Sequence, residues 1–153
     1  MEMPPERKIT KSRRLCRTLL VWLGLVCCLA GSAPGADVKL IANASVKVSE
    51  VSAEEIKNIF LETRTSLSDG SRVQPALLRT GPAHAAFIKQ FIGRSDAALE
   101  TYYRSLVFTG RGLIPPAFAS DADMAAYVAK TKGAIGYVSA NADVSGVKVI
   151  EVR

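Results

Sequence analysis

The feature that most constrains this chain is a sharp change in composition at about residue 36. All three cysteines (Cys16, Cys27 and Cys28) and six of the 20 Lys and Arg residues precede that point. Residues 37–153 keep 14 Lys and Arg against 12 Asp and Glu, so the overall charge of +6 falls to +2 there. A nearly neutral, cysteine-free segment excludes a structural disulfide, thiolate chemistry and a basic nucleic-acid-binding surface.

Residues 1–36 have the pattern of an export signal. A basic stretch ends at Arg17, an apolar run covers 19–30, and small residues follow as far as Ala36. This order is typical of a secretory signal peptide, and the apolar run is shorter than the roughly 20 residues that span a bilayer. We therefore predict a signal peptide over 1–36 and a periplasmic or secreted domain over 37–153. An uncleaved anchor is the alternative.

The exported segment alternates strand and helix patterns. Strand patterns cover 38–42, 73–78, 134–138 and 147–152. Four helix patterns are also present: one begins at Ser52, one ends before Gly93, and the other two follow Ser95 and Ser120. The first helix is marked by a capping box of Ser52 and Glu55. With 48% hydrophobic residues, wholesale disorder is excluded. The alternation predicts one α/β domain with helices packed on a small mixed sheet.

No catalytic or metal-binding constellation stands out in the sequence of the exported segment. It has one histidine and no cysteine, which excludes the usual structural zinc sites. No Gly-x-Ser-x-Gly nucleophile motif is present. The acidic pairs Glu54/Glu55 and Asp121/Asp123 fall in first turns of predicted helices, where they favour the helix dipole. We predict no enzyme activity, no cofactor and no metal.

Two glycine-containing loops are candidates for anion binding. The first runs through Arg79, Thr80 and Gly81 into a predicted helix that carries His84, so backbone N–H groups would point at one place. The second places Arg111 between two glycines on a flexible loop. We expect Thr80, Gly81, His84 and Arg111 to line one concave surface at the strand ends, with Arg79 as a further anion ligand. Ordinary surface positions for the arginines, and a partly exposed helix position for His84, are the alternatives.

Three stretches of this segment resemble the phosphate-type periplasmic substrate-binding proteins. Val51–Leu61 is similar to the leucine-x-x-glutamate-leucine-x-x-isoleucine-phenylalanine helix of that family. Asp69–Pro75 fits the turn and strand after it, and Gly133–Val138 is similar to the family's Gly-Ala-Ile-Gly-Tyr-Val strand. Residues 108–116 resemble the short members often named phosphate ABC transporter substrate-binding proteins. The resemblance covers nearly all of 38–152.

This resemblance implies a single lobe of the type 2 periplasmic-binding-protein fold, in which two α/β lobes normally close on the ligand. The family's Gly-Ser-Gly-Thr phosphate loop falls on Thr80-Gly81-Pro82-Ala83. Gly81 and Ala83 therefore replace its two hydroxyl residues, and Pro82 removes an N–H donor. His84 falls where an arginine often follows in the family.

Two functions stay open at this point. The resemblance implies an exported solute-binding protein for phosphate or a related small anion, transported across the envelope with a transporter, a porin or a second copy as partner. The altered loop leaves the alternative of an envelope interaction protein on the same fold, which binds a protein partner and no small ligand. Neither interpretation involves nucleic acid, or a membrane beyond the signal segment.

Overall fold

Strand β6 (Ala134–Ser139) is the centre of the domain. The computed structural model describes residues 37–153, and the predicted signal peptide lies outside the described residues. Residues 134–138 of β6 are all buried. A strand covered on both faces needs a continuous apolar run, and Ala-Ile-Gly-Tyr-Val supplies one.

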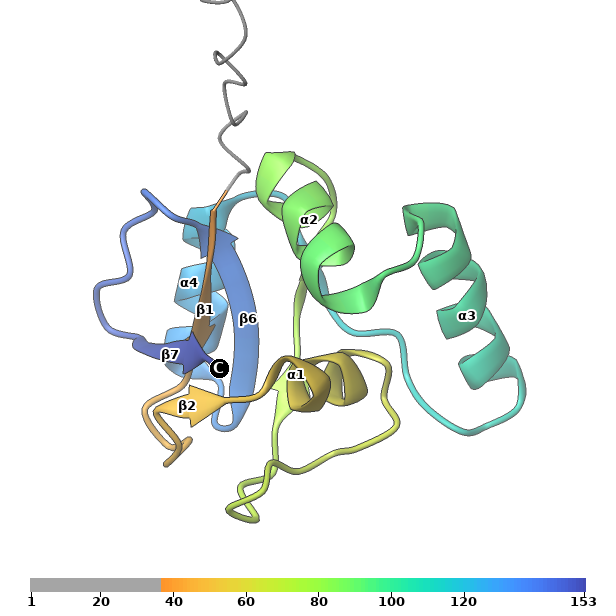
Figure 1. Cartoon of the computed structure of the whole chain (residues 1–153), viewed down its shortest axis with the longest axis horizontal. Helices are drawn as coiled ribbons and strands as arrows, with labels where there is room; N and C mark the ends of the chain where they lie inside the picture. Colours follow the sequence, from red (N-terminus) through yellow and green to blue (C-terminus); the bar gives the residue numbers. More distant parts are fainter. Residues whose placement is uncertain (1–36) are drawn as a thin grey trace, which may run out of the picture. The chain divides into compact units, whose positions relative to one another are not determined.

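The main sheet is mixed and has the strand order β2-β7-β1-β6-β3 (Figure 1). Its members are β1 (Val38–Ala42), β2 (Glu50–Val51), β3 (Gln74–Pro75), β6 and β7 (Lys148–Val152). β1 runs antiparallel to both β6 and β7, while β2 runs parallel to β7 and β3 parallel to β6. β3 forms one edge of the sheet, where the missing N–H of Pro75 is tolerated. The predicted small mixed sheet is confirmed.

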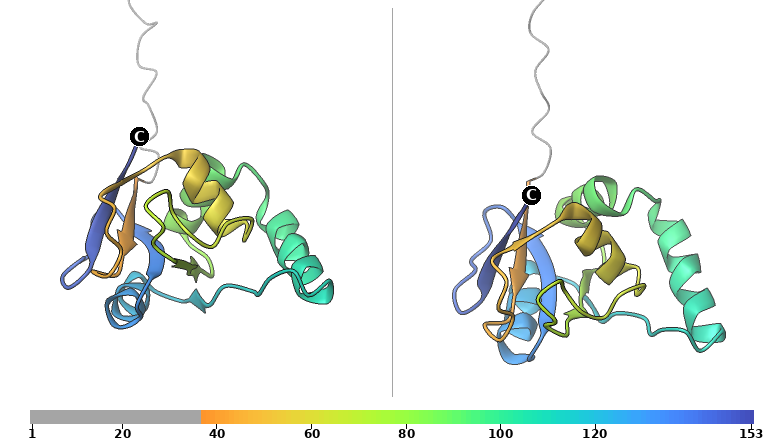
Figure 2. Two further views of the ribbon diagram at one scale, coloured as in Figure 1. Left: turned by 90° about the horizontal axis from the view of Figure 1, so that it is seen from below. Right: turned by 60° about the horizontal axis from the view of Figure 1, so that its bottom comes forward.

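Helices cover both faces of this sheet (Figures 1 and 2). α4 (Asp121–Lys130) packs on one face and α2 (Pro82–Phe87) on the other. Successive strand residues point to opposite faces. Gly136 accordingly lies under Met124 of α4. Tyr137 stacks on Phe87 of α2, with ring centroids 3.8 Å apart and planes 5° from parallel.

The first helix, α1 (Ala53–Phe60), begins with the predicted capping box. The Ser52 hydroxyl accepts the N–H of Glu55 at 3.2 Å, and the Glu55 carboxylate accepts the N–H of Ser52 at 3.3 Å. At the other end of α1, Phe60 packs against Phe87 with ring centroids 4.6 Å apart. α1 therefore joins α2 and β6 in one aromatic core.

The remaining elements extend away from the main sheet. α2 continues into a π-helical turn, η1 (Ile88–Ile92), which ends at Gly93. α3 (Asp96–Phe108), capped by Ser95, lies at the edge of the domain (Figure 1). The chain returns through residues 109–116 to β5 (Ala117–Phe118), which pairs in parallel with β4 (Leu77–Leu78).

Two sequence predictions need correction. The strand expected over 73–78 is two short strands, β3 and β4, separated at Ala76, because β4 leaves the main sheet to pair with β5. The helix expected before Gly93 changes from α to π geometry at Ile88. The two-residue strands β2 and β5 carry no periodic pattern, and sequence reasoning missed them.

No helix among residues 37–153 is long and apolar enough to cross a membrane.

Gly133 offers a test of how tightly this fold is packed. Its φ is +77°, and a Cβ there would lie 2.7 Å from the carbonyl oxygen of Arg72. We expect Gly133→Ala to lower the free energy of unfolding by clearly more than the roughly 1–2 kcal/mol of left-handed strain alone. Gly70 is the matched control, because its φ is +80° and a Cβ there would meet nothing within 4 Å. Equal losses in urea unfolding would show that the close approach to Arg72 has no energetic consequence.

Candidate functional site

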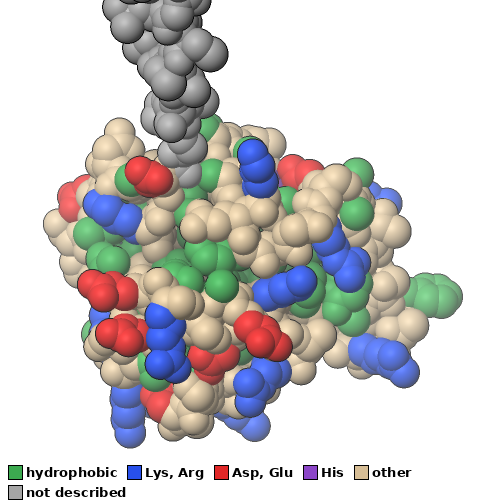
Figure 3. Space-filling model, in the orientation of Figure 1, with side chains coloured by type: hydrophobic (Ala, Val, Ile, Leu, Met, Phe, Trp, Pro, Cys, Tyr) green, Lys and Arg blue, Asp and Glu red, His purple; other side chains and the backbone are tan. Residues whose placement is uncertain are grey.

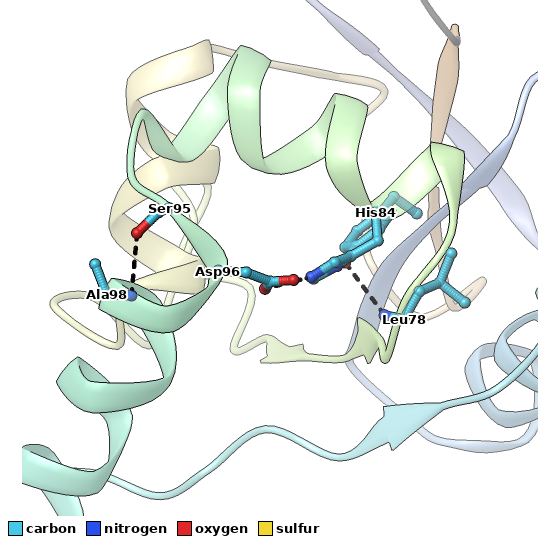
Figure 4. A network of polar contacts seen from close by, with 6 residues as sticks. Leu78, His84, Ser95, Asp96 and Ala98 are labelled. Atoms are coloured by element: carbon cyan, nitrogen blue, oxygen red, sulfur yellow. Dashed lines mark hydrogen bonds and ion pairs between the residues drawn. The ribbon is translucent and has the colours of Figure 1, made fainter.

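His84 lies in the core and not on the surface. His84 is 5% exposed and lies on the inner side of α2. Nδ1 lies 2.6 Å from the hydroxyl of Tyr137, and Nε2 lies 2.7 Å from Oδ1 of Asp96 (Figure 4). The expectation of a partly exposed helix histidine is therefore wrong. Because α2 packs on the sheet, its first turn directs His84 toward β6.

The hydrogen-bond partners of His84 select one arrangement of protons. A carboxylate only accepts, so Nε2–H donates to Asp96 and Nδ1 accepts the hydroxyl proton of Tyr137. The Tyr137 oxygen in turn accepts the N–H of Leu78 at 3.2 Å (Figure 4). Burial raises the pKa of Tyr137 well above its ordinary value, so the hydroxyl keeps its proton. A neutral His84 satisfies every partner in this chain.

This polar chain also attaches α3 to the rest of the domain. Asp96 is the first residue of α3, and two tyrosines farther along the helix add further attachments. The hydroxyl of Tyr102 donates to the carbonyl of Leu61 at 2.7 Å, and that of Tyr103 donates to the carbonyl of Phe60. Carbonyls at a helix C-terminus lack partners within the helix. The end of α1 is thus satisfied by α3.

The turn before α2 leaves several backbone donors free. Arg79, Thr80 and Gly81 are exposed, and Gly81 takes a φ of +108° that favours glycine. Within residues 37–153, the N–H groups of Thr80, Gly81, Ala83 and His84 donate to no other residue. A Cβ built on Gly81 would meet nothing within 4 Å, so space lies open before the turn. Free N–H groups at a helix start favour an anion.

Arg79 is held beside β5. Its Nε donates to the carbonyl of Ala117 at 3.2 Å. Arg79 and His84 share a hollow of about 440 Å³, which Asp96 and Glu100 also line. Both carboxylates oppose an anion in this hollow. The charge distribution therefore favours an anion at the turn and the Arg79 guanidinium over one deeper in this hollow.

The structure places the five predicted site residues in different settings. Arg79, Thr80 and Gly81 form the exposed turn, and both ring nitrogens of His84 are already engaged. Arg111 follows the end of α3, where its N–H donates to the carbonyl of Leu106, and it does not line the hollow that Arg79 and His84 share. Sequence reasoning missed Asp96 as a partner of His84. Asp96 lies 12 residues after His84 in sequence, so no local pattern indicated the contact.

Comparisons with known proteins identify the fold. No protein-family model and no curated protein matches the sequence. A protein from Clostridium perfringens, described as a phosphate ABC transporter substrate-binding protein and solved with bound phosphate, matches with a TM-score of 0.57 and 17% identity over 75% of this chain. An ABC-type phosphate transport receptor from Vibrio cholerae matches with a TM-score of 0.57 and 13% identity over 75% of this chain.

A third match, PstS from Borrelia burgdorferi, has a TM-score of 0.56 and 10% identity over 76% of this chain. This chain covers 44%, 45% and 47% of the three proteins, so it spans less than half of their length. The predicted single lobe of a periplasmic-binding-protein-like fold is confirmed. The first is described as a substrate-binding protein and the second as a transport receptor, in agreement with the prediction that the domain is not an enzyme.

The polar chain at His84 gives a stability prediction. Tyr137→Phe leaves the N–H of Leu78 and Nδ1 of His84 without a partner in the core. We expect it to lower the free energy of unfolding by about 2 kcal/mol or more, since each unsatisfied buried group costs roughly 1–3 kcal/mol. Tyr127→Phe is the control, because the Tyr127 hydroxyl forms no hydrogen bond within the described residues. Similar urea midpoints for both variants would contradict a stabilising role of the chain.

Proposed function

We propose that residues 37–153 form an exported solute-binding domain that binds phosphate or a related small anion, for transport across the envelope. One observation carries this proposal: the turn before α2 offers four free N–H groups beside the Arg79 guanidinium. The turn follows a strand end and opens on free space. The fold shared with a substrate-binding protein solved with bound phosphate and with a phosphate transport receptor supports the proposal.

The turn also limits the affinity. The Thr80 hydroxyl is its only side-chain hydroxyl, and Pro82 contributes no N–H. Each hydrogen bond to a charged group contributes roughly 1.5–3 kcal/mol. The loss of two hydroxyls relative to a Gly-Ser-Gly-Thr loop therefore predicts much weaker binding. A lobe on its own leaves one side of the anion in water, so we propose that a transporter subunit, a porin or a second copy of this chain supplies the other wall.

The matched arginine variants Arg79→Gln and Arg111→Gln test the site. Both remove one exposed positive charge, but only Arg79 belongs to the turn. Calorimetric titration with phosphate at low salt should show affinity reduced about two- to fivefold in Arg79→Gln, since an exposed ionic contact contributes up to about 1 kcal/mol. Arg111→Gln should bind like the parent protein, and sulfate more weakly than phosphate.

Two outcomes would contradict the proposed site or the proposed function. An equal loss in the two variants would mean a general charge effect and would exclude the turn as the site. No heat and no thermal shift at millimolar phosphate would overturn the solute-binding proposal.

A specific surface feature supports a second candidate, an envelope interaction protein. Val107, Phe108, Leu113 and Ile114 are 46%, 93%, 75% and 56% exposed. They lie within one short stretch at the end of α3 and the loop after it. Hydrophobic side chains project where α3 forms the edge of the molecule (Figure 3). Clustered exposed apolar residues mark interaction surfaces more often than scattered ones do. We propose a protein partner for this stretch in the second candidate, with a second copy as the first partner to test.

Phe108→Ser tests that candidate. If Phe108 is buried between two copies, sedimentation equilibrium should show dimers for the parent protein and monomers for the variant at the same concentration, because burying a large apolar side chain contributes about 1.5–3 kcal/mol. Val149→Ser, at a 43% exposed site on β7, is the control and should remain dimeric. A parent protein that is monomeric at all concentrations would exclude the self-association.

A further inference from the structure

A second hollow, of about 550 Å³, lies at the end of the sheet where β1 stops and β3 and β6 begin. Three loops surround it: residues 43–49, residues 66–73 and residues 131–133. They lie side by side along the lower edge of the domain in Figure 1. The turn before α2 lies beyond the other end of the β3–β4 segment. We call this hollow the loop-end site.

Gly133 joins the three loops into one rigid frame. Its N–H donates to the Ser45 hydroxyl at 3.0 Å, and its carbonyl accepts the N–H of Gln74 at 2.8 Å. Its backbone also approaches the carbonyl of Arg72 closely, so that only glycine fits. Because each loop is tied to Gly133, binding a ligand here costs little ordering of the backbone.

Each loop contributes one basic side chain to the loop-end site. These are Lys47, Arg72 and Lys132. Within residues 37–153, none of the three forms an ion pair or donates a side-chain hydrogen bond. All three are exposed, and basic side chains are visible along this lower edge in Figure 3.

The one carboxylate that lines the hollow is already engaged. Asp69 accepts the Ser71 hydroxyl at 2.6 Å and the Ser71 N–H at 2.9 Å. These two hydrogen bonds hold the pKa of Asp69 below its ordinary value, and nearby Lys47 adds to the effect. Three unpaired cations therefore face one partnered anion, with the side chains of Ser45 and Gln74 as additional polar partners.

We propose that the loop-end site binds a small polyanion that carries two or more phosphate groups. Its volume falls in the range of small-ligand sites, roughly 300–1,000 Å³. Three cations on separate loops fit a ligand whose negative charge is spread over several groups better than they fit a single oxyanion. The lining residues include no aromatic side chain to stack on a base, which argues against single-stranded nucleic acid. Clustered phosphates occur in free polyphosphates and in lipid headgroups, and the chemistry is shared.

The experiment is an NMR titration of the protein with inorganic pyrophosphate at low salt. Shifts should concentrate at 45–47, 69–74 and 131–133. Lys47→Gln, Arg72→Gln and Lys132→Gln should each weaken binding about two- to fivefold, as expected for exposed ionic contacts. Asp69→Asn should strengthen binding, because it removes the opposing charge while keeping an acceptor for Ser71. Lys89→Gln, at an exposed lysine on η1, is the charge-matched control and should bind unchanged.

Two further experiments distinguish a lipid headgroup from a free polyphosphate, and the loop-end site from the turn before α2. Sedimentation with vesicles of phosphatidylcholine and a phosphoinositide tests the lipid source, and loss of that binding in Lys132→Gln would assign the phosphates to a headgroup. Arg79→Gln should keep the pyrophosphate response, so failure of the turn before α2 leaves this proposal standing. Shifts spread over the whole surface, an equal loss in Lys89→Gln, or no response to either probe would overturn it.

Discussion

The packing of Tyr137 in the centre of β6 is the interaction on which the rest of the domain depends. Its ring stacks on Phe87 and lies near Phe60, which brings α2 and α1 onto the same face of the sheet. Its hydroxyl meets Leu78 and His84, and His84 reaches Asp96 on α3. A buried hydroxyl must find partners. One side chain therefore sets the positions of β4, α2 and the start of α3.

The domain separates two kinds of surface. At the turn before α2, free backbone N–H groups and Arg79 form the proposed oxyanion site, and the carboxylates of Asp96 and Glu100 lie in the neighbouring hollow. At the loop-end site, three unpaired basic side chains surround a rigid hollow. The first surface would bind an anion largely through backbone dipoles, and the second through side-chain charge. Salt should therefore weaken anion binding more strongly at the second surface.

The apolar end of α3 is a third surface that bears on function. The chain spans less than half the length of the three solved proteins that match its fold. The end of α3 exposes apolar side chains. The helix is attached to the body by the buried side chains of Leu99 and Tyr103, by the hydroxyls of both tyrosines at 102 and 103, and by the contact of Asp96 with His84. In the second candidate function, this apolar stretch is the proposed surface for a protein partner.

Local patterns predicted much of the fold: the capping box at Ser52, the cap at Ser95 and the buried run of β6 depend on neighbours in sequence. The burial of His84, its contact with Asp96, the separation of β3 from β4 and the meeting of Lys47, Arg72 and Lys132 were decided by the tertiary structure. The physical reason is the distance along the sequence over which each interaction acts. Caps and strand patterns are short-range, whereas these contacts join residues whose approach depends on how helices pack across β6.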